Sequence, residues 1–190
     1  EAVNLGYISE AEIDTAVMRL FTARMKLGMF DPQEMVPYGA IHPSDYNTAA
    51  NRKMARKVAR ESIVLLKNDQ SVLPFLKKVK KIAVIGPYAD ELSVLLGNYN
   101  GIPTDPVTIL QGIKNRAGRQ TRVEYAIGVD QPEKLARDTG RLYLQAELET
   151  EAINIAVKSD LIVFVGGISP ELEGEEMPVK IDGFSGGDRT

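Results

Sequence analysis

The chain contains the stretch Leu161-Ile-Val-Phe-Val-Gly-Gly-Ile-Ser-Pro-Glu-Leu-Glu-Gly-Glu-Glu176, in which apolar residues lead into two glycines and then a group of carboxylates. An apolar run that is rich in β-branched residues predicts a strand in the interior of a parallel sheet. Gly166 and Gly167 would let the chain leave that sheet at a sharp angle. Because ligands bind beyond the carboxyl ends of the strands in open α/β sheets, the sequence predicts a functional loop that contains Glu171, Glu173, Glu175 and Glu176.

Two further apolar segments and the helices between them predict the rest of the sheet. Residues 82–86 have the composition of a buried strand, and residues 122–126 alternate as a strand does. Thr108 is placed to cap a helix that runs through Ala117, and residues 146–158 predict another amphipathic helix. Strands and helices in this order favour a parallel sheet covered on both faces. We therefore expect an α/β fold, a three-layer α/β/α sandwich with a mainly parallel sheet.

The first third of the chain has a different pattern. Ser9-Glu-Ala-Glu12 is a capping box that predicts the start of a helix, and apolar residues recur at helical spacing as far as Leu27. Residues 31–46 are rich in proline and predict an irregular connector, which makes them a candidate domain boundary. Residues 47–61 predict a second helix, and residues 62–67 predict a short apolar strand.

The composition excludes several classes of protein. The chain has 190 residues, of which 44% are hydrophobic and 26% are charged, and its net charge is −3. This mild acidity argues against a nucleic-acid-binding surface. No apolar run approaches the roughly 20 residues that a membrane-spanning helix requires. The chain has no cysteine and one histidine, so we expect no disulfide, no metal site and no cofactor.

Familiar catalytic and nucleotide-binding motifs are also missing from the sequence. Pro87 directly follows the strand predicted at 82–86, where a dinucleotide-binding loop would carry its glycines. There is no Walker lysine loop and no Gly-x-Ser-x-Gly elbow. His42 lies in the proline-rich connector, and we interpret it as a structural or exposed residue.

The carboxylate loop therefore remains as the candidate functional site. Its acidic residues could simply be solvated, because most glutamates are. However, carboxylates that lie close together raise one another's pKa, and this keeps one of them protonated near neutral pH. Glycoside hydrolysis requires such an acid together with a second carboxylate. Arg189 follows soon after the acidic residues and could bind substrate with them.

Several segments resemble glycoside hydrolase family 3. Leu20 to Pro32, which contains Lys26-Leu-Gly-Met-Phe-Asp-Pro32, is similar to the family's last barrel helix. Ala59-Arg-Glu-Ser-Ile-Val-Leu-Leu-Lys-Asn68 is similar to the entry into its second domain, an α/β sandwich. Further similarities are found in Ile82-Ala-Val-Ile-Gly-Pro87, Gly97-Asn-Tyr-Asn-Gly101 and Gly186-Gly-Asp-Arg189. The resemblance covers nearly the whole chain and is weakest over residues 129–144.

This resemblance implies a retaining β-glycosidase that removes terminal non-reducing β-linked glucose or xylose from oligosaccharides. In the family, an aspartate of the barrel domain is the nucleophile, and a glutamate of a sandwich-domain loop is the general acid/base. The family's signature for that loop falls on residues 172–176 and implies that Glu175 is the acid/base. Glu173 and Glu176 are the alternatives, and we expect them, together with Arg189, to contact substrate.

The resemblance also implies a division of the chain into parts of two domains. Residues 1–35 would end the barrel, residues 36–60 would link the domains, and residues 61–190 would begin the sandwich. The barrel's nucleophile is not in this sequence, because neither Asp45 nor Asp160 follows a buried barrel strand. We therefore expect the chain to be a fragment that needs the missing barrel domain of the same protein and is inactive alone.

Other interpretations remain open from the sequence. A non-catalytic α/β sugar-binding or regulatory module would carry the same sheet with an acidic loop that is only solvated. A nucleotide-binding Rossmann protein is a third interpretation, which Pro87 disfavours. Members of the family are often exported, so the resemblance favours a periplasmic or secreted protein over a cytoplasmic one. The sequence leaves open whether the protein forms a homodimer.

Overall fold

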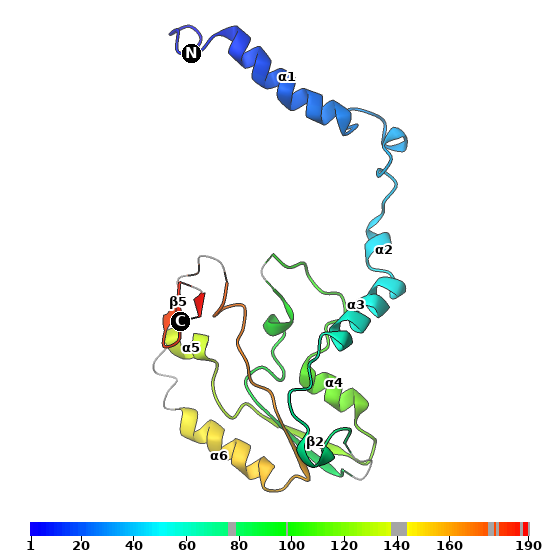
Figure 1. Ribbon diagram of the computed structural model, residues 1–190, viewed down its shortest axis with the longest axis vertical. Coiled ribbons are helices and arrows are strands. Elements are labelled where there is room, and N and C mark those ends of the chain that lie inside the picture. The colour runs from blue at the N-terminus through cyan, green and yellow to red at the C-terminus, as the bar shows by residue number, and fades with distance from the viewer. Residues whose placement is uncertain are drawn as a thin grey trace. The chain divides into compact units, whose positions relative to one another are not determined.

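The computed structural model describes residues 1–75, 79–97, 99–137, 144–174, 177, 179–186 and 188–189. The chain divides into two compact units, Glu1–Lys67 and Asn68–Thr190, which are described separately (Figure 1). No helix within the described residues is long and apolar enough to span a membrane. The helices and strands of the first unit are α1 (Glu10–Lys26), η1 (Gln33–Met35), α2 (Pro43–Tyr46) and α3 (Ala49–Glu61). Those of the second unit are η2 (Asp69–Ser71), β1 (Lys81–Ile85), η3 (Ser93–Leu95), α4 (Ile109–Arg116), β2 (Arg122–Ala126), α5 (Pro132–Arg137), α6 (Gln145–Ala156), β3 (Leu161–Phe164), β4 (Lys180–Ile181), β5 (Phe184–Ser185) and β6 (Asp188–Arg189).

The predicted capping box starts α1. The Ser9 hydroxyl accepts a hydrogen bond from the Glu12 amide at 3.3 Å, and the Glu12 carboxylate accepts one from the Ser9 amide at 2.7 Å. These reciprocal bonds satisfy two amides that have no partner inside the helix. Leu27 caps the carboxyl end of the helix, and the following Gly28 takes the left-handed conformation (φ +68°) that commonly closes helices.

The prediction of a strand over residues 62–67 is wrong. This segment is irregular, and the side chains of Ile63 to Leu66 are between 63% and 92% exposed. A strand forms only where another strand satisfies its backbone groups, and within the described residues none pairs with this segment. Apolar β-branched composition alone therefore did not produce a strand here.

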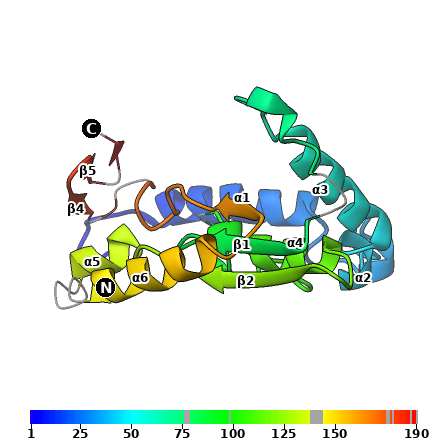
Figure 2. The same ribbon diagram turned by 90° about the horizontal axis from the view of Figure 1, so that it is seen from below.

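The second unit is built on the predicted parallel sheet. Its strands lie in the order β2-β1-β3, and β1 is parallel to both neighbours. Val84 is the partner of Tyr125 in β2 and of Val163 in β3, and Figure 2 shows β1 and β2 side by side. The observed strands match the predicted segments to within one residue at either end.

Helices cover the two faces of this sheet, which confirms the three-layer α/β/α architecture. Side chains alternate between faces along a strand. Ile82 and Val84 of β1 therefore pack with Leu110 of α4 on one face, whereas Ala83 and Ile85 pack with Ala152 of α6 on the other. Figure 1 shows α4 and α6 on opposite sides of the strands.

Strand β3 differs from the expectation of an interior strand. Leu161 and Val163 pack on the α4 side, whereas Ile162 and Phe164 are 53% and 65% exposed. Within the described residues β3 pairs only with β1, and α6 packs mainly over β1 and β2. The part of the chain that the structure describes therefore leaves the outward face of β3 uncovered. Beyond β3, the short strands β4, β5 and β6 form a separate antiparallel sheet.

Candidate active site at the carboxyl edge of the sheet

The topology places one edge of the sheet where a ligand is expected. The connection from β1 to β2 runs through α4 on one face, and the connection from β2 to β3 runs through α6 on the other. The direction of winding therefore reverses between β1 and β3. In open α/β sheets the ligand crevice lies at such a reversal, beyond the carboxyl ends of the strands. The carboxylate loop that follows β3 leaves the sheet at this edge.

The ends of β1 and β3 approach each other closely at this edge. The Val165 amide donates to the Ile85 carbonyl at 2.7 Å, and the Gly86 amide donates to the Ala126 carbonyl at 3.1 Å. Gly86 has φ +138°, and a Cβ at this position would overlap the backbone of Val165. Only glycine is compatible with both the conformation and the space. The glycine that ends the first predicted strand therefore has a packing role.

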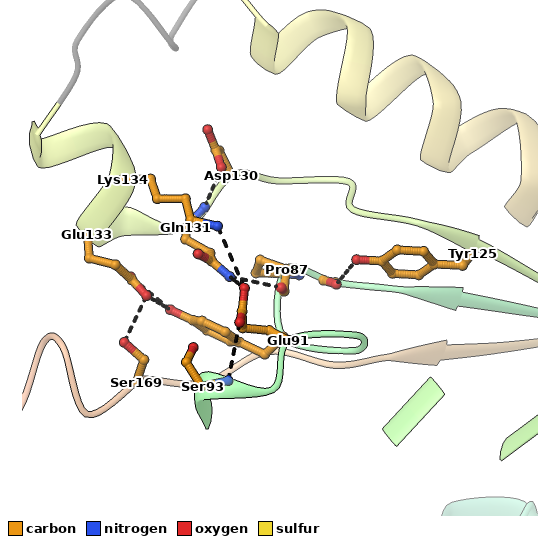
Figure 3. A network of polar contacts seen from close by, with 11 residues as sticks. Pro87, Glu91, Ser93, Tyr125, Asp130, Gln131, Glu133, Lys134 and Ser169 are labelled. Carbon is orange, nitrogen blue, oxygen red and sulfur yellow. Dashed lines mark hydrogen bonds and ion pairs between the residues drawn. The ribbon is translucent and has the colours of Figure 1, made fainter. Parts of the chain in front are cut away.

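A buried polar cluster connects the loops that follow all three strands. Tyr88 follows β1, Glu133 lies in α5 after β2, and Ser169 follows β3. The Tyr88 hydroxyl donates to Glu133 Oε2 at 3.1 Å. The Ser169 hydroxyl donates to Glu133 Oε1 at 2.8 Å, as Figure 3 shows. The three residues are 5%, 6% and 3% exposed, respectively. One buried carboxylate therefore links the loops after β1 and β3 to helix α5.

The surroundings of Tyr88 keep its hydroxyl protonated. Burial is the larger cause, and the negative charge of Glu133 adds to it, so that the pKa of Tyr88 is raised from about 10 to about 12. At neutral pH the hydroxyl is thus a hydrogen-bond donor, and the carboxylate is its acceptor.

A second polar cluster holds the start of the loop after β1. The side-chain amide of Gln131 donates to Glu91 Oε2 and to the Pro87 carbonyl, both at 3.2 Å. The Ser93 amide donates to Glu91 Oε1 at 3.2 Å, and Lys134 Nζ lies 3.7 Å from Glu91 Oε2 (Figure 3). The Ser93 backbone bond, followed by the Gln131 bond, lowers the pKa of Glu91. A cavity of about 230 Å³ adjoins this cluster and is lined by Pro87, Asp90, Glu91, Tyr125, Ile127, Asp130, Gln131 and Lys134.

The loop after β3 begins with a turn that is organised by Ser169. The Ser169 carbonyl accepts hydrogen bonds from the amides of Leu172 at 3.0 Å and Glu173 at 3.3 Å. Its hydroxyl oxygen accepts another from the Glu171 amide at 3.3 Å. Leu172 is 1% exposed and anchors the turn in the interior. The backbone entering the carboxylate segment is therefore held by a buried side chain and several hydrogen bonds.

The structure describes some of the residues that were expected to form the site and not others. Glu173 is exposed, and it lines an open groove of about 380 Å³ together with Val94, Leu95, Leu96, Gly97, Ile168, Ser169 and Pro170. The groove therefore lies between the loops that follow β1 and β3. Glu175 and Glu176 lie outside the described residues. Arg189 belongs to β6, and its side chain lies outside the described part of the structure.

The two aspartates considered as nucleophiles have structural roles. Asp160 Oδ2 accepts hydrogen bonds from the amides of Lys80 and Lys81, both at 2.9 Å, at the amino end of β1. Asp160 is thus at the opposite edge of the sheet from the carboxylate loop. Asp45 lies in the four-residue helix α2, where its Oδ2 accepts a hydrogen bond from the His42 amide at 2.8 Å. His42 begins that helix, so its observed role is structural.

Sequence reasoning missed the cluster of Tyr88, Glu133 and Ser169. Ser169 lies within the stretch that predicted the site, but only as a residue between the strand and the carboxylates. Glu133 lies in the part of the chain with no clear periodicity. The one signal for this cluster in the sequence was that the Glu133 carboxylate follows the predicted strand at 122–126, as the carboxylate loop follows the strand at 161–165.

Comparison with known proteins agrees with this architecture. Residues 63–190 match the family model described as the glycosyl hydrolase family 3 C-terminal domain. A xylan 1,4-beta-xylosidase of Xylanibacter ruminicola is 42% identical over 130 residues, which are 68% of this chain and 15% of that protein. A beta-xylosidase/alpha-L-arabinofuranosidase 1 of Medicago sativa subsp. varia is 36% identical over 179 residues, which are 93% of this chain and 21% of that protein.

Solved structures give the same result. A GH3 exo-beta-xylosidase in complex with a xylobiose aziridine probe is 32% identical and has a TM-score of 0.71, with 93% of this chain and 21% of that chain covered. A beta-glucosidase from Listeria innocua in complex with glucose is 26% identical and has a TM-score of 0.62, with 91% and 22% covered. The chain belongs to glycoside hydrolase family 3. It spans about a fifth or less of the length of these relatives.

Proposed function

We propose that this chain is part of a longer retaining β-glycosidase and supplies its general acid/base. The observation that carries the proposal is the position of the loop after β3. This loop leaves the sheet at the reversal of winding, is anchored by buried Leu172 and Ser169, and presents the carboxylate of Glu173 to an open groove. The carboxylate-rich segment of residues 171–176 thus continues from a fixed start.

In the proposed reaction, Glu175 is the acid/base. It would protonate the glycosidic oxygen while an aspartate of the barrel domain attacks the anomeric carbon, which forms a covalent glycosyl-enzyme intermediate. It would then remove a proton from the water that hydrolyses this intermediate. Glu173 and Glu176 are the alternatives, and with Arg189 they would contact the sugar. This chain would carry one of the two catalytic carboxylates.

We propose terminal β-linked xylose as the preferred substrate sugar. The relatives named β-xylosidases are 42% and 36% identical to this chain. Among solved structures, an exo-β-xylosidase is 32% identical, and two β-glucosidases are 30% and 26% identical. The substrate would be an oligosaccharide with xylose at its non-reducing end. The barrel domain of the same protein would supply the nucleophile and most contacts to the sugar.

The test is to assay the full-length protein on 4-nitrophenyl β-xyloside and β-glucoside and to follow the first-formed sugar by proton NMR. The proposal expects faster release from the xyloside and a product that initially has the β configuration, because a double displacement retains configuration. A purified chain of these residues alone should show no turnover. A full-length protein that binds xylo-oligosaccharides without hydrolysing them would instead be a sugar-binding module.

A further inference from the structure

Glu133 is an unusual carboxylate for this sheet edge, because it is almost completely buried and is held by hydroxyl groups. It is 6% exposed, and within the described residues it forms no ion pair. A buried carboxylate without a cation is unfavourable unless hydrogen bonds replace its lost hydration. Tyr88 and Ser169 supply those hydrogen bonds. The packing of apolar groups therefore does not explain why a glutamate is buried at residue 133.

Ser169 gives the cluster a connection to the carboxylate loop. Its hydroxyl donates to Glu133 at 2.8 Å and accepts from the amide of Glu171 at 3.3 Å, so that it bridges the buried carboxylate and the loop backbone. Its carbonyl accepts from the amides of Leu172 and Glu173. A displacement of Ser169 would therefore move the turn that immediately precedes the proposed acid/base.

Tyr88 fixes the other side of the carboxylate. Its hydroxyl donates to Glu133 at 3.1 Å, and Tyr88, in the loop after β1, is 5% exposed. Because Tyr88 remains protonated, both partners of Glu133 are donors, and a carboxylate, which only accepts, satisfies both of them. A glutamine at residue 133 would direct an amide N–H₂ group toward one of the two hydroxyls.

We propose that Glu133 is a positioning residue for the acid/base loop, which it holds in register with the rest of the sheet edge through the Ser169 hydroxyl. The inference rests on the proposed function, because it assigns a role in presenting the general acid. Glu133 contacts no substrate in this scheme. It acts through Ser169, and Tyr88 secures its carboxylate from the opposite side.

The test uses the full-length enzyme with Ser169→Ala and Glu133→Gln. The readout is kcat/KM for phenyl β-xyloside and for 2,4-dinitrophenyl β-xyloside. The phenyl compound needs a proton on its leaving group, and the dinitrophenyl compound does not. Since small displacements of catalytic groups reduce rates by about tenfold to a hundredfold, we expect that loss on the phenyl substrate for Ser169→Ala. On the dinitrophenyl substrate we expect a change below about twofold, because acid catalysis contributes little there.

Thr121→Val is the matched control. Thr121 also donates a hydroxyl hydrogen bond to another segment, at 2.9 Å to the Val79 carbonyl, but it lies at the amino end of β2. It should lower thermal stability without changing the ratio between the two substrates. If the control changes the ratio as strongly as Ser169→Ala does, the effect is a general loss of stability and the proposal is wrong.

A double variant separates positioning from independent structural roles. Because Ser169→Ala and Glu133→Gln interrupt the same hydrogen bond, the double variant should lose no more activity on the phenyl substrate than the Ser169→Ala variant does. The proposal would be overturned if the fold-losses of the two single variants multiplied in the double variant. Equal losses on the phenyl and dinitrophenyl substrates would also overturn it. If Ser169→Ala does not fold, Glu133→Gln carries the test, because it preserves side-chain volume and should still slow the phenyl substrate severalfold. A wild-type enzyme without turnover would instead overturn the proposed function.

Discussion

Gly86 and Val165 are in such close contact that a methyl group on Gly86 would overlap the carbonyl oxygen of Val165. The two residues directly follow the neighbouring strands β1 and β3, where the winding of the sheet reverses. This contact fixes the distance between the loop that contains Tyr88 and the loop that contains Ser169. The spacing of these two loops in the candidate site therefore depends on the absence of a side chain at residue 86.

Substituting Gly86→Ala should strongly destabilise the protein. The new methyl group would meet backbone atoms, which cannot move aside, and alanine rarely adopts φ +138°. We expect a loss of about 2–4 kcal/mol in the free energy of unfolding, measured by urea denaturation of the full-length enzyme. Gly101→Ala is the control, because a methyl group at that position would meet no atom within 4 Å beyond its chain neighbours. Equal stability of the two variants would contradict the close contact.

Leu172→Ala should loosen the carboxylate loop. Leu172 is 1% exposed, and removing a buried leucine side chain usually costs about 2–5 kcal/mol. We expect faster proteolytic cleavage near residues 169–177 and slower hydrolysis of substrates with poor leaving groups. Leu172→Met preserves the volume and should behave like the wild-type enzyme. Unchanged cleavage in Leu172→Ala would mean that the side chain does not anchor the loop.

The raised pKa of Tyr88 predicts a loss of stability at alkaline pH. Burial and the Glu133 charge raise this pKa to about 12 in the folded state, against about 10 for an unperturbed tyrosine. The stabilisation is fully present below pH 10 and is lost between about pH 10 and 12, because the unfolded chain releases its proton first. Wild-type stability should therefore fall more steeply than that of Tyr88→Phe over this range. Parallel pH curves for the two proteins would contradict the assignment.

The partly buried ion pair of Lys81 and Glu124 predicts the opposite dependence at acidic pH. Lys81 Nζ lies 2.6 Å from Glu124 Oε2, and this bond, with the neighbouring Arg122, lowers the pKa of Glu124 below its usual 4.5. The contribution is present above pH 4.5 and disappears as the pH falls through the lowered value. The difference in stability between wild type and Glu124→Gln should therefore shrink below pH 4.5. A constant difference from pH 3 to 7 would contradict this role.

The sequence predicted those parts of the fold that local patterns determine. The capping box at Ser9 and the cap at Thr108 form as expected, since each needs only residues within one helical turn. The strand at 122–126 is found at its predicted bounds. The segment 62–67 is not a strand, because a strand also needs a partner, and periodicity contains no information about partners.

The sequence predicted where the carboxylate loop lies in the fold but not the hydrogen bonds that hold it. The glycines after 161–165 and the topological rule together predicted that the carboxylate loop leaves the sheet at the carboxyl edge, and the loop after β3 begins there. The contact between Glu133 and Ser169 joins segments that the sequence separates by an entire helix and strand. No local pattern indicates such a contact, since it depends on how three loops meet in space.

The most direct test of the account is the comparison of Glu175→Ala with Glu173→Ala and Glu176→Ala in the full-length enzyme. If the loop after β3 supplies the acid/base at residue 175, only Glu175→Ala should lose about a hundredfold or more on phenyl β-xyloside while remaining active on the dinitrophenyl compound. Added azide should then restore turnover and yield a β-xylosyl azide. Wild-type kinetics in all three variants, with no response to azide, would contradict the claim that this loop carries the proton donor.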